Sequence, residues 1–193
     1  RWQEVFGGAE EQLLNRTNGG VADAAALRKT YWRETPEARR EALMPFLWRE
    51  IAKRGQIYGN RRKGSEARLT NGQKFSYPGY NEFLTGAVDA RIDSNDKIPN
   101  PNTNVFEWLN QQPPFKGRVA AAINWDVIPW ILNAERSRLP VWSGLPLPER
   151  APGSFPVSPQ LTELVADTTP TFNGMTYDSL IFQAAHDYVR EQK

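Results

Sequence analysis

Residues 75–86 read FSYPGYNEFLTG, and this stretch decides the fold that we expect for the chain. It follows Asn71-Gly72, the strongest short-range signal for a two-residue hairpin turn. Residues 67–70 and 73–76 flank this dipeptide and are predicted to pair as the strands of a β-hairpin. The run Tyr-Pro-Gly-Tyr then leads the chain into a short helix, predicted over residues 81–85.

Ser76 is the predicted last residue of the hairpin, before this helix. The unpaired N–H groups and positive dipole end of a helix at such a junction can bind a phosphate or sulfate ester without net charge on the protein. A serine hydroxyl is a weak nucleophile at neutral pH and needs a base or a metal ion. No histidine lies near Ser76 in the sequence, which favours metal activation. The alternative is a structural serine that ends the strand and caps the helix.

The same residues resemble the nucleophile motif of nucleotide pyrophosphatase/phosphodiesterases and related members of the alkaline phosphatase superfamily. In that family a Thr or Ser ends a strand, an aromatic residue and a proline follow, and a short helix closes with Thr-Gly. Ser76, Tyr77-Pro78 and Thr85-Gly86 match these positions at the same spacing. Residues 87–102 are similar to a bacterial subgroup described as alkaline phosphatase family or sulfatase-like proteins.

The resemblance implies roles for individual residues. Ser76 matches the catalytic nucleophile, and Tyr77 is a candidate substrate-binding residue beside it. In the resembling phosphodiesterases an Asn in the loop after the helix donates a hydrogen bond to a non-bridging oxygen of the substrate. Asn95 is our candidate for this role, and the nearby asparagines compete with it: Asn100, Asn102 and Asn104. A turn asparagine in a polar loop is the plainer alternative.

Trp125 is a further candidate for substrate binding. Residues 118–123 form a short apolar run that fits a buried parallel strand. Trp125 follows the carboxyl end of this predicted strand, where the binding sites of α/β proteins collect. It either lines a substrate pocket or simply packs.

Helix signals recur along the rest of the chain. Thr35-Pro36-Glu37 predicts a helix start, Gly55 a stop, and Pro45 a kink or break between them. Further helices are predicted over residues 105–111, around Pro129, and from Asp178 to the C-terminus, while residues 139–160 are predicted to be mostly loop. Strands that alternate with helices predict a three-layer α/β fold of the alkaline phosphatase type, incomplete, with the β-hairpin before the nucleophile helix.

The resemblance also implies two divalent metal ions, Zn²⁺ or Mn²⁺. Their ligands are an Asp at the end of a first strand and Asp and His groups from later strands, which correspond to positions before Arg1 and after Lys193. Residues 1–193 are therefore expected to form a single α/β domain or a partial domain that lacks the metal-binding strands at both ends. Ser76 is the one metal-contacting residue expected in the chain, which alone is expected to hold no metal and to be inactive.

The composition limits the other classes. The chain has 193 residues and no Cys, which excludes disulfides and thiolate metal sites, and its one His makes a self-contained zinc site improbable. A net charge of +2 gives no case for binding a nucleic acid polymer, and no apolar stretch is long enough to span a membrane.

The predicted function is metal-dependent hydrolysis of a small-molecule phosphate or sulfate ester through Ser76. The alternatives are phosphoryl transfer of the phosphomutase type and a non-catalytic binding domain on the same fold. The resemblance further implies the periplasm or secretion from a bacterium.

Overall fold

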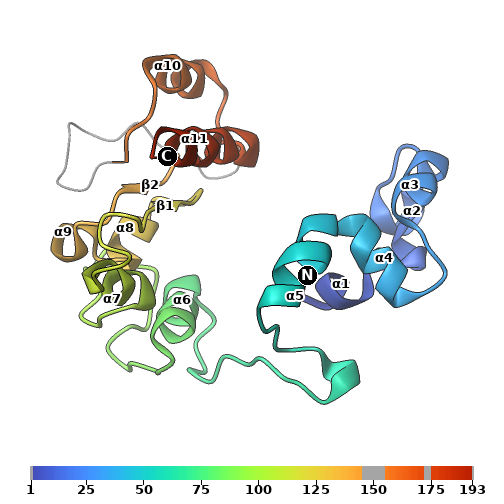
Figure 1. The fold of residues 1–193 in the computed structure, drawn as a ribbon, viewed down its shortest axis with the longest axis horizontal. Coiled ribbons are helices and arrows are strands. Elements are labelled where there is room, and N and C mark those ends of the chain that lie inside the picture. The colour runs from blue at the N-terminus through green and yellow to red at the C-terminus, as the bar shows by residue number, and fades with distance from the viewer. Residues whose placement is uncertain (1, 145–154, 172–174, 193) are drawn as a thin grey trace. The chain divides into compact units, whose positions relative to one another are not determined.

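The computed structural model describes residues 2–144, 155–171 and 175–192. It is mostly helical, with 50% helix and 2% strand. The prediction of a three-layer α/β fold is therefore wrong. The chain divides into two compact units, Arg1–Arg68 and Leu69–Lys193, and each is described by itself (Figure 1).

The first unit is entirely helical in its described part. Its α-helices are joined by short 3-10 turns (η1, η3) and one π-helical turn (η2). In chain order the elements are α1 (Trp2–Gly7), η1 (Glu11–Leu13), α2 (Arg16–Gly19), α3 (Ala24–Tyr31), α4 (Pro36–Leu43), η2 (Leu47–Ile51), α5 (Ala52–Arg54) and η3 (Arg61–Lys63).

An aromatic contact between α1 and η2 closes the first unit. Phe6 is buried, and its ring meets the Trp48 ring edge-on with centroids 6.0 Å apart. The Trp48 indole N–H donates to the Val5 carbonyl at 3.0 Å. The Arg40 guanidinium covers the Trp48 ring at 3.7 Å, a cation–π contact. Gly8 has φ +69 and lies so close to the backbone of α4 that a Cβ there would clash with Arg39.

The helix predicted from Thr35 is confirmed, and so is its break. The Thr35 side chain accepts a hydrogen bond from the Ala38 N–H, and Pro36 is the first residue of α4. The helix stops at Met44, whose φ −135 and ψ 69 are not helical. Met44 precedes Pro45, and the proline ring excludes the α conformation at the residue before it.

The second unit holds the remaining helices and one small sheet. In chain order its described elements are α6 (Ser76–Thr85), α7 (Val105–Gln111), β1 (Ala121–Ala122), α8 (Ile128–Ile131), α9 (Ala134–Ser137), β2 (Val141–Trp142), α10 (Pro159–Asp167) and α11 (Asp178–Glu191). The helices predicted over residues 105–111 and from Asp178 are confirmed.

The sheet is much smaller than predicted. Of residues 118–123 only Ala121 and Ala122 form a strand, which pairs in parallel with Val141 and Trp142. β2 lies inside the segment predicted to be loop, and residues 145–154 of that segment are outside the described residues. A core containing Tyr77, Ile128, Ile131 and Leu139 packs between α6, α8 and the sheet.

The predicted β-hairpin before α6 is wrong as well, because the carboxylate of Glu82 binds the turn. Glu82, on α6, accepts the backbone N–H groups of Thr70 (2.7 Å) and Asn71 (3.0 Å). It also accepts the Thr70 hydroxyl (2.7 Å) and the Asn71 side-chain amide (2.8 Å). Gly72 has the left-handed φ of +70 expected for the turn, but residues 67–70 and 73–75 form no strand, and Thr70 and Asn71 bind Glu82 of α6.

Helix α6 begins at Ser76, five residues before the predicted start at residue 81. Pro78 is tolerated because it lies in the first turn, where its missing N–H is not required. Ser76 is therefore the first residue of a helix and not the end of a strand.

Four asparagines tie the loop after α6 to the rest of the unit. Asn100 is 1% exposed, and its Nδ2 donates to Asn81 Oδ1 (3.2 Å) and to the Ile131 carbonyl (3.1 Å). Asn102 donates to the same Asn81 oxygen (3.2 Å). Asn133 Nδ2 donates to the Asn100 carbonyl at 2.8 Å. This set, Asn81, Asn100, Asn102 and Asn133, is called the asparagine network below.

Arg136 adds charge to the asparagine network. Its guanidinium binds both oxygens of Glu107, at 2.9 and 2.8 Å, and donates to the carbonyls of Asn100 and Asn102. The ion pair joins α7 to α9; the Glu107 side chain is 5% exposed and the Arg136 side chain 39%, so the pair is buried only at its Glu107 end. In the described part of the chain, no helix is long and apolar enough to cross a membrane.

We predict that Asn100→Ala lowers the free energy of unfolding by about 2 kcal/mol, because buried partners lose their hydrogen bonds. Urea unfolding measures the loss. Asn110→Ala is the control, since Asn110 is half exposed and makes one side-chain bond, to the Gly117 N–H. Equal midpoints for Asn100→Ala and the native chain would contradict the role of the asparagine network.

Hydrogen bonds from the Thr70 hydroxyl, and then from its N–H and from Asn71, hold the pKa of Glu82 below its ordinary value. A depressed carboxyl pKa stabilises the fold above the unfolded pKa of about 4.3, and this stability is lost as the pH falls through the folded pKa. We predict that Glu82→Gln is less stable than the native chain at neutral pH and that the difference shrinks in acid. Glu163→Gln on α10 is the control; a constant difference at all pH values would refute the prediction.

Candidate functional site

Ser76 lies at the exposed first turn of α6. The preceding residue, Phe75, is extended and provides no side-chain cap, and no acidic residue lies in the first turn. Ser76 is exposed, and its hydroxyl makes no hydrogen bond within the described residues. A free hydroxyl therefore lies at the positive end of a ten-residue helix.

The structure brings Asn95 to the same turn. Asn95 Oδ1 accepts the Tyr77 backbone N–H at 2.9 Å, across eighteen positions of sequence. Asn95 is exposed, and its Nδ2 has no hydrogen-bond partner in the part of the chain that is described. The Asn95 amide can therefore donate to a ligand beside Ser76.

The competing asparagines are engaged elsewhere. The Nδ2 groups of Asn100 and Asn102 each make two hydrogen bonds within the protein. Asn104 donates to the Leu132 carbonyl and caps α7 with its oxygen. All three are structural, so Asn95 is the one with an unengaged amide donor next to Ser76.

Tyr77, the residue after Ser76, is buried and hydrogen-bonded in the core of the unit. Its ring is 2% exposed, and its hydroxyl donates to the Ile98 carbonyl at 2.8 Å and lies 3.2 Å from the Trp130 carbonyl. Burial raises the pKa of Tyr77 to about 12, against a smaller opposing effect of Arg136. The ring also lines a cavity of about 280 Å³, together with Arg91, Asp93 and other residues of the following loop.

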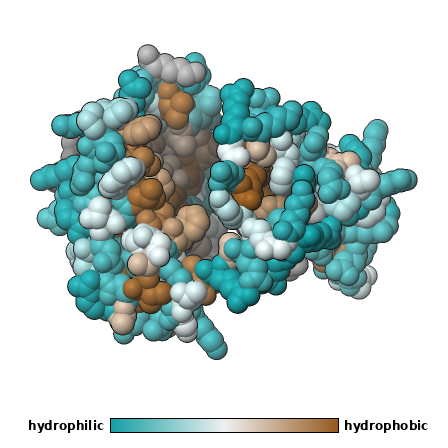
Figure 2. Space-filling view, turned by 60° about the horizontal axis from the view of Figure 1, so that its bottom comes forward, coloured by the Kyte–Doolittle hydropathy of each residue, from teal (hydrophilic) through white to brown (hydrophobic). Residues whose placement is uncertain are grey.

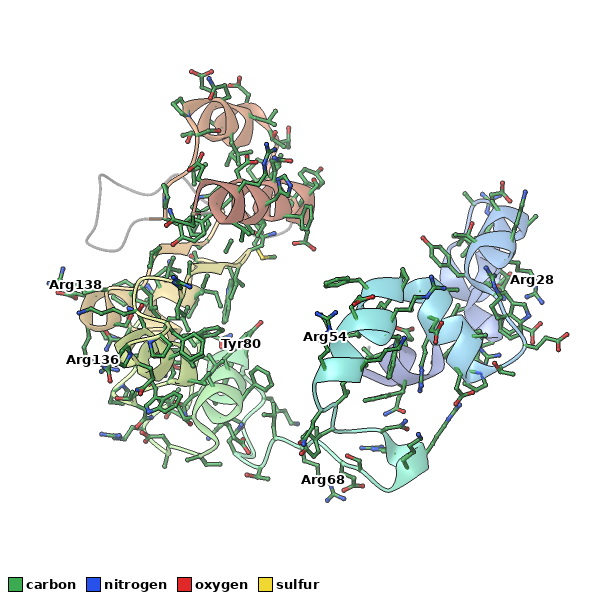
Figure 3. The ribbon with its side chains drawn as sticks, in the orientation of Figure 1. Arg28, Arg54, Arg68, Tyr80, Arg136 and Arg138 are labelled. Atoms are coloured by element: carbon green, nitrogen blue, oxygen red, sulfur yellow. The ribbon has the colours of Figure 1, made fainter. Side chains whose placement is uncertain are left out.

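The Trp125 ring contacts α6 at the ring of Tyr80. The two rings are tilted by 35°, with centroids 6.2 Å apart. Tyr80 follows Ser76 by four residues and so lies on the same face of the helix. Its ring projects from α6 (Figure 3) and is 38% exposed. Trp125 therefore contacts α6 at Tyr80, which lies one helical turn after Ser76.

An ion pair connects the two loops that contribute Asn95 and Trp125 to the candidate site. Lys97 Nζ binds Asp126 Oδ2 at 2.5 Å and joins the loop of Asn95 to the loop of Trp125. Tyr80, Lys97 and Asp126 were not among the predicted site residues. The four-residue spacing from Ser76 could have indicated Tyr80, but the Lys97–Asp126 pair has no signature in the sequence.

Arg91, the second cation of the loop, is also paired with a carboxylate. Arg91 binds the Asp89 carboxylate through Nε (2.9 Å) and Nη2 (2.6 Å). These bonds from Arg91, with one from Asn102, hold the pKa of Asp89 well below its usual range. Neither Arg91 nor Lys97 therefore offers an unpaired charge to a ligand at Ser76.

Among the described residues, no three or more His, Asp or Glu side chains gather in a way that could hold a metal ion. These residues therefore do not by themselves provide a binding set for the two ions that the resemblance implies. Comparison of the chain with protein-family models, with curated proteins and with solved structures found no match.

We predict that the stability of the chain depends on the ionisation of Tyr77 in alkaline solution. Because its pKa is raised in the folded state, Tyr77 contributes stability that is complete below the unfolded pKa of about 10 and is lost as the pH rises through about 12. The difference in unfolding free energy between the native chain and Tyr77→Phe should therefore shrink over this range. Tyr58→Phe, at an exposed tyrosine, is the control; a pH-independent difference for Tyr77→Phe would count against the prediction.

Proposed function

We propose that the chain carries the nucleophile and part of the substrate-binding site of a hydrolase that cleaves singly charged phosphate or sulfate esters. One observation carries the proposal: the free hydroxyl of Ser76 and the free amide of Asn95 lie at one exposed helix terminus. Their roles match those implied by the resemblance to the alkaline phosphatase superfamily, although the fold differs from the one expected.

Charge favours a monoanionic substrate. The donors at the site are the neutral Asn95 amide and the helix terminus, and the two cations of the Asn95 loop, Arg91 and Lys97, are paired with carboxylates. Residues 69–193 contain 10 basic and 13 acidic residues, a net charge of −3, which does not attract a polyanion. A phosphate diester or a sulfate monoester carries one negative charge and suits this site better than a dianionic phosphate monoester.

The proposed reaction has two steps. The Ser76 oxygen attacks phosphorus or sulfur, its O–H bond breaks, and the leaving alcohol departs on the opposite side with a proton. Water then attacks the covalent Ser76 ester and restores the hydroxyl. Asn95 donates to a non-bridging oxygen in both steps and holds the ester in line.

Activation of Ser76 requires a group that the described residues do not supply. The proposal includes two divalent ions, Zn²⁺ or Mn²⁺, for which the described residues provide no cluster of His, Asp or Glu ligands. Tyr80 and Trp125 contribute an aromatic surface next to the ester group.

We predict that Asn95→Asp weakens the binding of a singly charged ester by about tenfold or more, because it removes the donor, adds a like charge and still accepts the Tyr77 N–H. The probes are dimethyl phosphate and methyl sulfate, titrated into the full chain and followed by the amide NMR signals of residues 76–79 and 95. Asn110→Asp is a matched control, since Asn110 Oδ1 also accepts a backbone N–H.

Catalysis is tested on the protein as isolated from its source, with added Zn²⁺ or Mn²⁺. We expect bis-p-nitrophenyl phosphate or p-nitrophenyl sulfate to be cleaved faster than p-nitrophenyl phosphate, and Ser76→Ala to lower the rate on the order of 10³-fold or more. An undiminished rate for Ser76→Ala would refute the nucleophile, and transfer to an added alcohol in place of water would indicate a phosphomutase.

A further inference from the structure

A second cavity, of about 330 Å³, lies in the unit that contains α6, and none of the candidate site residues lines it. Pro99, Pro129 and Trp130 form its apolar side. Asn133, Glu135 and Arg138 form its polar side. Its volume is at the lower end of the range of cavities that bind small organic molecules, and a mainly apolar wall with a few polar groups is typical of them.

Two residues of this cavity have strained backbones. Asn133 has φ 44 and Arg138 has φ 56, and among the described residues they are the only non-glycine residues with positive φ. Asn133 is explained by its side chain, which donates to the Asn100 carbonyl and caps α9 through the Arg136 N–H. Asparagine also tolerates the left-handed conformation better than most residues.

Arg138 is the left-handed cap of α9, and its N–H donates to the Ala134 carbonyl at 3.0 Å. It follows the last residue of α9, a position where glycine is the usual residue because a Cβ is unfavourable there. Its side chain is exposed and makes no hydrogen bond or ion pair within the described residues. The Arg138 guanidinium at the rim of the cavity is therefore available to a ligand.

The neighbouring charges define that partner. Arg136, at the same end of the unit (Figure 3), is committed to Glu107 and to two carbonyls, which leaves Arg138 as the available cation of the cavity. Glu135 at the same rim makes no ion pair in the described part of the chain, so the two charges of the cavity sum to zero. Because Glu135 offsets Arg138, the cavity has no net positive charge, which disfavours a dianion such as a phosphate monoester. Trp130 provides a flat apolar wall, and its indole N–H makes no hydrogen bond within the described residues.

We propose that this cavity binds a small apolar carboxylate, with its carboxylate on the Arg138 guanidinium and its apolar body against Trp130. The guanidinium fork matches the two oxygens of a carboxylate. The proposal does not depend on the ester hydrolase proposed above, because Ser76, Asn95 and Trp125 do not line this cavity.

The test uses the full chain and phenylacetate, with phenylacetamide and phenethylamine as neutral and cationic analogues. We expect phenylacetate to shift the NMR signal of the Trp130 indole N–H and the amide signals of residues 133–138, and the analogues to bind at least tenfold more weakly. Arg138→Gln should weaken phenylacetate binding at least tenfold. Arg118→Gln, at an exposed arginine without a bonded partner, should leave it unchanged. Absence of phenylacetate binding, equal binding of phenylacetamide, or unchanged binding by Arg138→Gln would overturn the proposal.

Arg138→Gly provides an independent measurement. Glycine adopts φ 56 without strain, so we expect this variant to melt at a higher temperature than the native chain and to lose phenylacetate binding. A lower melting temperature with binding intact would mean that Arg138 serves packing, and the proposal would be wrong.

Discussion

The second unit depends on hydrogen bonds made by buried asparagines. Residues 87–104 contain no helix or strand, yet this loop is held firmly because Asn100 and Asn102 bind Asn81 on α6, while Asn133 binds the Asn100 backbone. A buried amide without partners is costly, so each of these side chains accepts essentially one geometry. That geometry places Asn95 beside Ser76 and Lys97 opposite Asp126. The asparagine network therefore fixes the position of this loop through hydrogen bonds, as pairing between strands would do in a layered fold.

Helix α6 is the element on which these contacts converge. Its Glu82 holds the turn at Asn71, its Asn81 holds the loop that follows, and its Tyr77 reaches two carbonyls in the core. The helix is fixed by polar contacts of Tyr77, Asn81 and Glu82, while Ser76 at its start is exposed. The Tyr77 N–H is bound by Asn95 and Pro78 has no N–H, so the groups that remain for an anion at this end are the Ser76 hydroxyl and the Asn95 amide.

The two candidate sites differ in how their cations are used. In the loop of Asn95 the cations Arg91 and Lys97 are paired with carboxylates, and the Asn95 amide is a neutral donor, so this loop suits a single diffuse charge. In the cavity beside α9, Arg138 is unpaired and faces an apolar wall. Large apolar side chains are also exposed in this unit, among them Phe83 (78%) and Phe182 (70%), and apolar patches are visible on the surface in Figure 2. Single exposed apolar residues need no explanation, and nothing in the structure shows what covers these two.

Local signals in the sequence determined several helices of this protein. The Thr35-Pro36 start, the break before Pro45, the helix over residues 105–111 and the helix from Asp178 depend on caps, proline geometry and periodicity, which act within a few residues. The same local signals at Asn71-Gly72 indicated a hairpin, because a turn dipeptide cannot reveal that a carboxylate on α6 competes for the backbone N–H groups. The layered fold inferred from alternating strands and helices and from the resemblance was wrong as well, because in the described residues only Ala121–Ala122 and Val141–Trp142 form strands. The sequence also indicated Ser76 and Asn95 as candidates, but it could not separate Asn95 from Asn100, Asn102 and Asn104. Only the tertiary structure decided between them, because burial and long-range hydrogen bonds consume three of these amides and leave the fourth free at the start of α6.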